Sequence, residues 1–335
     1  MPAQKLDPFR FRIYQEALKT VPDLEKQRLL VGFSGGPDSV FLALFLKDIL
    51  GTQALELVYC NHQLRSTAEQ TQELHFVKTF AKQGGFSVSL QTLNVRLFAQ
   101  QTHQSIEAAA RELRYQQFTQ IAIEKSCQIV VTAHHLDDHI ETMLFQLFRG
   151  AKRGLSGIST LRPLNQNLLL WRPLLSISKS DLRNYLDSKK QAYSIDSSNE
   201  SLEFTRNKIR KELIPLIEQI NPNYKDVLST YVCYAKDMAH YCESNTEHYL
   251  LHLEEFTQGH RIRLEILLSL SPIEQSFLLY QIWDLITQNQ FRPSSIQTQA
   301  ILSSIQEKGA SKTISISKDF QVKINHDYLS FTQIK

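Results

Sequence analysis

Two carboxylates that could carry chemistry stand three residues apart in the stretch AHHLDDHIET, residues 133–142. On a helix Asp138 and Glu141 would be neighbours on the surface, and so would Asp137 and Glu141, which are four apart. Paired carboxylates near the start of a helix can hold a metal ion, hold an ammonium group or accept a proton. The helix dipole alone favours acids at this end, which explains Asp137 and Asp138 but not the adjoining His134 and His135.

The same stretch raises zinc as an alternative. His134, His135 and Asp138 are residue types that bind this metal. However, no complementary ligand pair at a fixed spacing accompanies them, and Cys60 near His62 adds little support. Zinc is therefore the weaker interpretation.

A second candidate site is the stretch SGGPDS, residues 34–39. It follows the short apolar run 29–33, which indicates a buried strand, and precedes an apolar helix over 38–50. Gly35 and Gly36 permit unusual backbone angles, and free amides at a helix start, with the Ser34 and Ser39 hydroxyls, suit an anion such as phosphate. The stretch is neither a Walker loop nor GxGxxG, and an ordinary strand-to-helix turn is the alternative.

Two further stretches carry polar side chains at useful spacings. In EAAARELRY, residues 107–115, Arg111 and Arg114 are three apart and would project the same way, a geometry suited to phosphate oxygens. Glu107 could pair with Arg111 along the helix, and a solvated charged face is the alternative. NHQLR, residues 61–65, directly follows a predicted strand.

Strands alternating with helices must position these residues. We expect strands over 29–33, 54–60, 86–93 and 127–132, and helices over 10–27, 38–50, 67–83, 105–125 and from 133 to 148. This alternation predicts a doubly wound, mainly parallel sheet with helices on both faces. SGGPDS, NHQLR and AHHLDDHIET each follow the carboxyl end of a strand, the edge where such sheets bind ligands.

The C-terminal part has a different pattern. Residues 211–241 are helical with an interruption at Pro222, and 264–286 and 294–307 predict further helices. The tail KTISISKDFQVKINHDYLSFTQI alternates apolar and polar residues, which predicts a small antiparallel sheet. We therefore expect a catalytic domain over 1–215 and a mostly helical domain over 216–335, with the boundary within 216–225.

Composition and charge distribution limit the partners and the cellular location that we expect for the protein. The 335 residues carry a net charge of only +3, yet residues 149–211 hold thirteen basic and five acidic residues, net +8. Such a band suits a polyanionic partner, with solvated surface lysines as the alternative. We find no apolar run of membrane-spanning length, no signal-peptide core in MPAQKLDPFRFR and no CxxC among four cysteines, so we expect a cytoplasmic location and no membrane partner.

Taken in order, SGGPDS, NHQLR, EAAARELRY, AHHLDDHIET and RGAKRGLSG form a series similar to that of the bacterial tRNA(Ile)-lysidine synthetase family. RPLL at 172–175, DSSN at 196–199 and TRNKIR at 205–210 extend this resemblance, which is dense over about residues 28–215. The family belongs to the ATP pyrophosphatase, or PP-loop, superfamily with its adenine nucleotide alpha hydrolase-like fold. The shorter C-terminal part matches only in outline, and longer family members carry a further tRNA-binding domain.

The resemblance implies a ligase that forms a C–N bond. ATP adenylates the 2-oxo group of the wobble cytidine in the CAU anticodon of tRNA(Ile), and free L-lysine then displaces AMP through its ε-amine. The products are AMP, pyrophosphate and lysidine, which switches codon reading from AUG to AUA. ATP and Mg²⁺ are the implied cofactors, tRNA(Ile) and L-lysine the implied partners, and a homodimer is one assembly that the sequence allows.

Roles carry over by the same resemblance. The implied catalytic residues are Asp38, Arg111, Asp138, Glu141 and Arg206. The implied ATP-binding residues are Ser34, Gly35, Gly36, Pro37, Asp38, Ser39, Asn61, His62, Arg65, Arg111, Arg114 and His134, with Asp38 also a candidate Mg²⁺ ligand. Asp138 and Glu141 would bind the lysine ammonium and help remove its proton, because only the neutral amine attacks. The basic residues Arg149, Lys152, Arg153, Arg206, Lys208 and Arg210 would meet anticodon phosphates.

Three alternatives stay open. A PP-loop tRNA thiolase shares the adenylation step but usually needs reactive cysteines or an iron–sulfur site. An amidotransferase-type relative would need an ammonia source, and no glutaminase-like segment is evident. A tRNA- or nucleotide-binding protein without catalysis would have no use for the acidic cluster.

Overall fold

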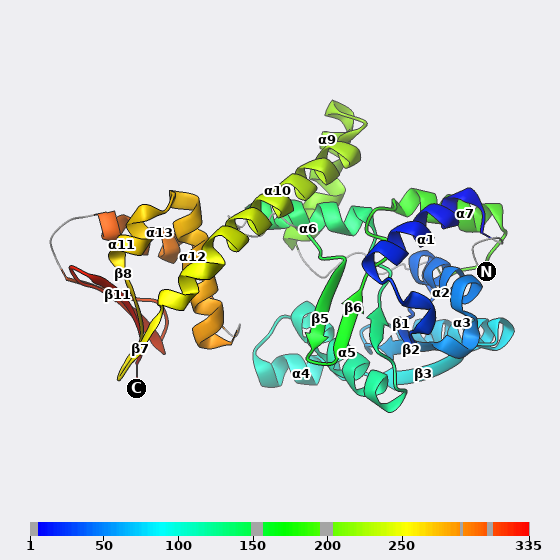
Figure 1. Ribbon diagram of the computed structural model, residues 1–335. Helices are drawn as coiled ribbons and strands as arrows, with labels where there is room; N and C mark the ends of the chain where they lie inside the picture. The colour runs from blue at the N-terminus through cyan, green and yellow to red at the C-terminus, as the bar shows by residue number, and fades with distance from the viewer. Residues whose placement is uncertain (1–5, 149–156, 195–203, 289–290, 307–310, 335) are drawn as a thin grey trace. The chain divides into compact units, whose positions relative to one another are not determined.

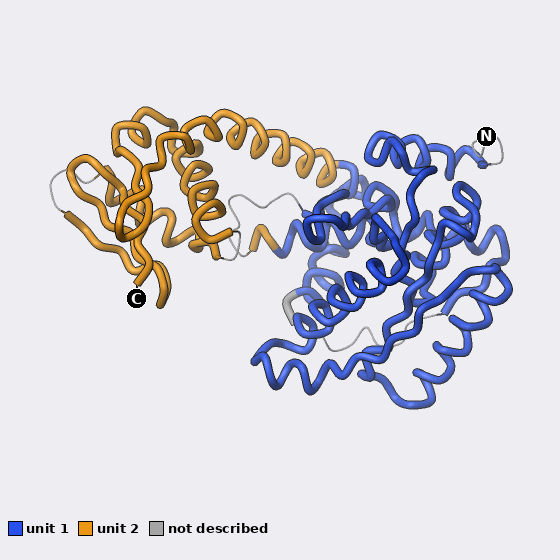
Figure 2. Tube along the Cα trace, turned by 60° about the horizontal axis from the view of Figure 1, so that its bottom comes forward, with its two compact units in different colours: residues 1–145, 157–226 blue, residues 146–156, 227–335 orange. Residues whose placement is uncertain are grey.

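The computed structural model describes residues 6–148, 157–194, 204–288, 291–306 and 311–334. The basic residues Arg149, Lys152 and Arg153, which the sequence predicts to meet tRNA phosphates, and the stretch DSSN, which extends the family resemblance, lie outside these ranges. The chain divides into two compact units, 1–145 with 157–226, and 146–156 with 227–335 (Figure 2). The predicted division into functional domains at 215/216 stays a prediction.

A six-stranded sheet forms the centre of the first unit, with strand order β3-β2-β1-β4-β6-β5 (Figure 1). Its strands are β1 (Leu29–Gly32), β2 (Leu55–Asn61), β3 (Ser87–Thr92), β4 (Ile129–Val131), β5 (Leu161–Asn165) and β6 (Leu168–Trp171). All neighbours pair in parallel except β5, which is antiparallel to β6. The predicted mainly parallel sheet is confirmed, with one antiparallel edge strand.

The helices of this unit follow the predicted alternation, with additions. They are α1 (Pro8–Thr20), α2 (Pro37–Leu50), α3 (Thr67–Gly84), α4 (Val95–Thr102), α5 (Ile106–Glu124), α6 (Leu136–Phe148), α7 (Lys179–Ser188), α8 (Phe204–Lys208) and α9 (Ile214–Ile220). Short 3₁₀ turns lie at Leu24–Lys26 and Thr52–Ala54, and the π-helical turn η4 (Ile209–Leu213) joins α8 to α9. The first predicted helix was too long, because α1 ends at Thr20.

Both faces of the sheet are covered because successive side chains of a strand point to opposite faces. Leu29 and Val31 belong to one apolar core with α2, whereas Leu30 belongs to another with Phe118 of α5. All three β1 side chains are fully buried, which explains why this strand reads as an unbroken apolar run.

The second unit combines helices with an antiparallel sheet. Helix α10 (Tyr224–Glu247) starts in the first unit and continues into the second, followed by η5 (His248–His252), α11 (Leu264–Ser269), α12 (Pro272–Thr287) and α13 (Ser295–Gln306). The sheet order is β7-β8-β11-β10-β9, with β7 (Glu254–Phe256), β8 (Gly259–Arg263), β9 (Lys312–Ser315), β10 (Phe320–Ile324) and β11 (Tyr328–Gln333). The predicted terminal meander β9–β11 is confirmed, and the β7–β8 hairpin enlarges it.

An aromatic core holds this unit together. The Trp283 ring of α12 packs edge-on against Phe331 at 5.3 Å, Phe320 at 5.6 Å and Phe291 at 5.8 Å between centroids. Such edge-to-face pairs add to the stabilisation from burial. Within the described ranges, no helix combines the length and hydropathy needed to cross a bilayer.

Candidate active site

A pocket of about 1070 Å³ opens at the carboxyl ends of β1, β2 and β4, three neighbouring strands of the sheet. The strand order reverses between β1 and β4, and such a switch point is where open α/β sheets bind ligands. The predicted site residues that line this pocket are Ser34, Gly36, Pro37, Asp38, Ser39, Asn61, His62, Arg65, Arg114, His134 and Asp138. One concave site thus receives side chains from all four stretches singled out in the sequence.

The loop between β1 and α2 has the geometry of an anion cradle. Gly35 adopts φ +83°, a left-handed conformation that favours glycine. The Ser39 hydroxyl donates to the Gly36 carbonyl at 2.9 Å, and the Ser34 and Ser39 hydroxyl oxygens are 3.3 Å apart. Helix α2 begins at Pro37, so the Asp38 and Ser39 amides of its first turn have no acceptor within the helix, whereas the Val40 amide donates to the Gly36 carbonyl.

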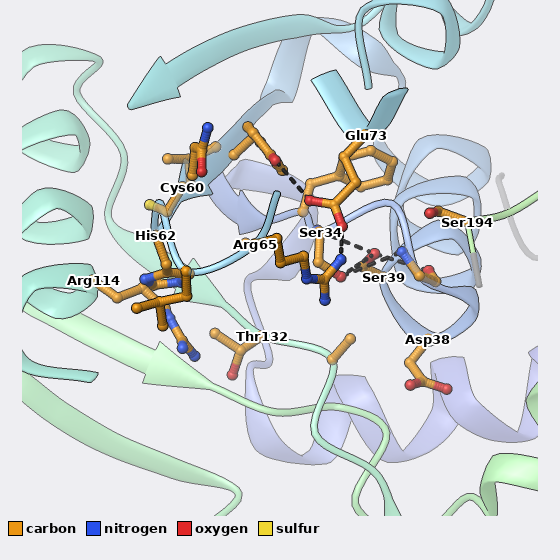
Figure 3. A pocket seen from close by; sticks show the side chains of 18 of the residues that line it. Ser34, Asp38, Ser39, Cys60, His62, Arg65, Glu73, Arg114, Thr132 and Ser194 are labelled. Atoms are coloured by element: carbon orange, nitrogen blue, oxygen red, sulfur yellow. Dashed lines mark hydrogen bonds and ion pairs between the residues drawn. The ribbon is translucent and has the colours of Figure 1, made fainter. Parts of the chain in front are cut away.

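Asp38 is the acidic group of this loop, and its side chain points into the site (Figure 3). Burial raises the pKa of this carboxyl; Asp138 adds to the shift, and His135, Lys179 and Arg183 oppose it. Its Oδ1 atom is buried and accepts no hydrogen bond within the described chain. A buried carboxylate oxygen without a donor fits an atom that would bind a cation.

At the other end of the pocket, the turn after β2 is shaped by its own side chains. Asn61 donates to Gln70 at 2.9 Å, and its Oδ1 accepts from the Gln63 amide. Arg65 forms an ion pair with Glu73, which also accepts from the Tyr59 hydroxyl at 3.0 Å (Figure 3). The turn is therefore a preformed wall of the pocket.

His62 and Arg114 lie together at this end, away from Asp38 (Figure 3). Burial, with Arg114 and Arg65 nearby, lowers the pKa of His62 to about 4, so its ring is neutral at pH 7. Burial also lowers the pKa of the Arg114 guanidinium, although it stays charged. An arginine removed from water in a pocket is poised to bind an anionic oxygen.

His134 also lines the pocket. Its Nδ1 is 2.9 Å from the Thr132 hydroxyl, and burial lowers its pKa to about 4 although Asp138 acts in the opposite direction. Arg111, from the same helix as Arg114, rests over the Tyr115 ring at 5.0 Å and does not line the pocket. Of the two arginines that the sequence treated as a pair, only Arg114 lines the pocket, although the charges of both lower the pKa of His134.

Two more predicted catalytic residues are held in ion pairs outside the pocket lining. Glu141 accepts from Arg210 Nε at 2.6 Å and from Nη2 at 2.7 Å, a bidentate pair. Arg206 pairs with Glu107 and lies over the Phe145 ring at 5.2 Å. Asp138 lines the pocket, but Glu141 beside it already holds a cation from its own chain.

Three residues outside the predicted catalytic and ATP-binding sets belong to the same site. Lys179 and Arg183 of α7 line the pocket near Asp38, and His135 contacts that carboxylate. Lys179 and Arg183 fall in the basic band, but nothing in the sequence marks them among its thirteen basic residues. The sequence marked His135 only as a candidate zinc ligand, although it stands directly beside His134 and before the acidic pair.

Among the described residues, no group of three or more His, Cys, Asp or Glu side chains has the arrangement of a metal site. A Mg²⁺ ion usually takes only one or two carboxylates, together with water and phosphate oxygens. Asp38, with its partnerless Oδ1, fits that arrangement.

The fold and the loop define the class of protein. A family model for the PP-loop domain matches residues 10–217, and the chain belongs to that family. The tRNA(Ile)-lysidine synthase of Persephonella marina is 32% identical over 317 residues, which cover 93% of this chain and 67% of that protein. The chain is thus a member of the tRNA(Ile)-lysidine synthase family, as its motifs indicated.

A second relative gives the same family name over a shorter stretch. The tRNA(Ile)-lysidine synthase of Bacteroides thetaiotaomicron is 39% identical over 216 residues, which cover 64% of this chain and 49% of that protein. The chain therefore spans about half the length of that relative.

A solved structure shares the fold. The U34-tRNA thiolase NcsA from Methanococcus maripaludis, which holds a [4Fe-4S] cluster, aligns with a TM-score of 0.55 over 68% of this chain and 79% of that chain. Sequence identity is 17%, so the likeness concerns the fold alone.

Proposed function

We propose that this protein is a tRNA(Ile)-lysidine synthetase. It would use ATP to adenylate the 2-oxo group of the wobble cytidine in a CAU anticodon. It would then join L-lysine to carbon 2 of that base, with release of AMP. The observation that carries the proposal is that Asp138 lines the same pocket as the PP-loop residues Ser34 and Gly36–Ser39. A phosphate cradle and a carboxylate for an ammonium group thus meet in one cavity.

The first group of pocket residues would bind the phosphates of ATP and the Mg²⁺ ion. The loop amides and the Ser34 and Ser39 hydroxyls would bind the pyrophosphate part of ATP, which is the leaving group of the first step. Asp38 would hold Mg²⁺, which offsets negative charge on the phosphates. Arg114, Lys179 and Arg183 line the same cavity and would bind phosphate oxygens.

Asp138 would act in the second step. Its carboxylate would bind the lysine ammonium and help remove a proton, because only the neutral ε-amine can attack the adenylated carbon. The bond from that carbon to the AMP oxygen breaks as the new C–N bond forms. Glu141 would join Asp138 in this role only after it exchanges the Arg210 guanidinium for the substrate cation.

The tRNA would approach through the basic band. Arg206, Lys208 and Arg210 lie on the continuous helical run of α8 and η4. The second unit would position the tRNA body, and the target base would leave the anticodon stack to enter the pocket. This substrate would place the protein in the cytoplasm, and a homodimer stays a prediction that light scattering can check.

The deciding experiment supplies the protein with ATP, Mg²⁺, labelled lysine and a tRNA(Ile) transcript carrying a CAU anticodon. We expect label in the tRNA together with AMP and pyrophosphate. Asp138→Asn should abolish lysine incorporation while the protein still binds a non-hydrolysable ATP analogue, since the substitution removes the carboxylate proposed to bind lysine and leaves the residues of the phosphate loop unchanged. An unchanged rate in this variant would contradict the assignment.

The other outcomes point to the alternatives. AMP release without lysine incorporation would indicate another nucleophile, with sulfur the first to test. Cys60 lines the pocket, but burial raises the pKa of its thiol to about 11, which disfavours the reactive thiolate. ATP binding without turnover on any tRNA would indicate a binding protein.

A further inference from the structure

His135 is the buried residue at the centre of the acidic cluster. It lies in the turn between β4 and α6, and only 4% of its surface is exposed. Three carboxylates surround its ring, and they come from two separate stretches of the sequence. Asp38 belongs to the PP loop, whereas Asp137 and Asp138 start α6.

Two reciprocal hydrogen bonds link His135 to Asp138, and one of them reaches the imidazole ring. The His135 amide donates to Asp138 Oδ2 at 3.1 Å, and the Asp138 amide donates to His135 Nδ1 at 3.4 Å. Because Nδ1 accepts, Nε2 is the ring nitrogen that carries a proton. That nitrogen is 3.6 Å from Asp38 Oδ2 and 3.4 Å from Asp138 Oδ2.

The third carboxylate does not compete for the Nε2 proton. Asp137 Oδ2 is 3.6 Å from Nδ1, on the accepting side of the ring. Its two oxygens accept instead from the Lys179 amide at 2.8 Å and from Lys225 Nζ at 2.7 Å. The Nε2–H group is therefore left to Asp38 and Asp138.

The Nε2–H group of His135 lies between the Asp38 and Asp138 carboxylates and reduces the repulsion between them. Asp38 and Asp138 repel each other, as the contribution of Asp138 to the raised pKa of Asp38 shows, while His135 acts in the opposite direction. The separations of 3.4 and 3.6 Å are longer than ordinary hydrogen bonds, so the attraction is mainly electrostatic, in a site largely shielded from water. Without the ring, the two side chains would move apart.

We propose that His135 is a positioning residue that holds the Asp38 and Asp138 carboxylates toward each other through its Nε2–H group. This inference rests on the proposed function, in which Asp38 serves the nucleotide half of the pocket and Asp138 the lysine half. The imidazole of His135 would thus couple the position of the carboxylate that serves ATP binding to the position of the carboxylate that binds the attacking amine. The residue acts through its neighbours and need not touch a substrate.

Two isosteric variants test the proposal. In His135→Gln the amide nitrogen can occupy the place of Nε2, whereas in His135→Asn the side chain reaches only the place of Nδ1. We expect His135→Asn to raise the KM for lysine and to weaken binding of a non-hydrolysable ATP analogue with Mg²⁺. The loss in kcat/KM should be on the order of 10- to 100-fold, as for other residues that orient a ligand-binding side chain without contacting the ligand. His135→Gln should retain most of the kcat/KM that His135→Asn loses.

A matched control comes from the helix that follows His135, α6. His139 is also buried, with its Nδ1 accepting from the Ile158 amide at 2.9 Å, and it does not line the pocket. Because an asparagine can replace that acceptor, His139→Asn should leave both substrate constants unchanged. Thermal unfolding of all three variants separates positioning from folding, because only a folding role would lower Tm in parallel with activity.

The proposal is overturned if His135→Asn and His135→Gln behave alike, whether both match the wild type or both lose binding and Tm together. Calorimetry with the ATP analogue needs neither tRNA nor turnover, so it remains informative if the wild type proves inactive with lysine. In that case a difference between the two variants in analogue binding would support the role toward Asp38, while the proposed function itself would have failed.

Discussion

At the scale of single residues, the phosphate loop depends on one backbone conformation. Gly35 has φ +83°, and a Cβ atom there would lie 3.0 Å from Phe76 Cδ1. Its carbonyl accepts from the Ser194 amide at 2.8 Å, which links the loop to the segment after α7. A side chain at this position therefore meets both an unfavourable φ and a tight contact.

We predict that Gly35→Ala lowers the free energy of unfolding by about 1–3 kcal/mol and weakens binding of an ATP analogue. Gly36→Ala is the matched control, because φ there is −70° and the nearest atom to an added Cβ is the Ser34 hydroxyl at 3.4 Å. Urea unfolding and calorimetry measure the two effects. Equal stability of the two variants would contradict the strain argument.

Buried histidines make stability depend on pH. The pKa of His62 is about 4 in the folded protein, below its ordinary value of 6.5. Between these values the unfolded chain binds a proton that the folded protein does not, so stability is complete above pH 6.5 and falls as the pH drops toward 4. The loss from this one group is at most about 3 kcal/mol.

We therefore predict that the urea midpoint decreases from pH 7 to pH 5 and that His62→Gln flattens this decrease. The glutamine carries no titrating proton at any of these pH values. A slope identical to that of the wild type would show that the ring is not held neutral.

At the scale of elements, ion pairs attach the segment 204–226 to the start and middle of α6. Arg210 of η4 binds Glu141 through two hydrogen bonds, and Lys225 at the start of α10 binds Asp137. The Glu141 side chain is only 9% exposed, whereas that of Arg210 is 42% exposed. Removing the arginine would leave a nearly buried carboxylate without its charged partner.

We predict that Arg210→Gln destabilises the protein by roughly 1–3 kcal/mol, with the lower part of that range set by the partial exposure of the arginine. Arg210→Lys keeps the charge but loses the planar guanidinium group, so its stability should lie between those of Arg210→Gln and the wild type. Thermal unfolding ranks the three proteins. If Arg210→Lys is as unstable as Arg210→Gln, the bidentate geometry rather than the charge provides the stability.

These pairs also show what could be predicted from the sequence and what could not. The apolar runs of β1, β2 and β4 predicted the strands, and strand polarity then predicted that the following polar stretches share one edge. Edge strand β5 was missed because Pro163 and its polar neighbours lack a strand pattern. The pairing of Glu141 with Arg210 joins residues 69 positions apart, and no local pattern encodes such a contact.

At the scale of the whole molecule, charge is distributed unevenly over a nearly neutral chain. The net charge is +3, but residues 149–211 carry +8. Within this band, Lys208 of α8 lies between Arg206 and Arg210, whose guanidinium groups pair with Glu107 and Glu141. A polyanion that binds along this segment would displace counterions, so its affinity should fall with salt concentration.

We predict that tRNA affinity decreases linearly on a logarithmic salt scale and that Lys208→Gln lowers the magnitude of the slope by about one, the value of a single phosphate contact. Lys19→Gln is the control, because Lys19 lies outside the band, is 71% exposed and pairs with Glu16. Filter binding at several salt concentrations gives both slopes. If Lys208→Gln and Lys19→Gln leave the slope equally unchanged, Lys208 makes no phosphate contact, and the tRNA must be held by other basic residues of the chain.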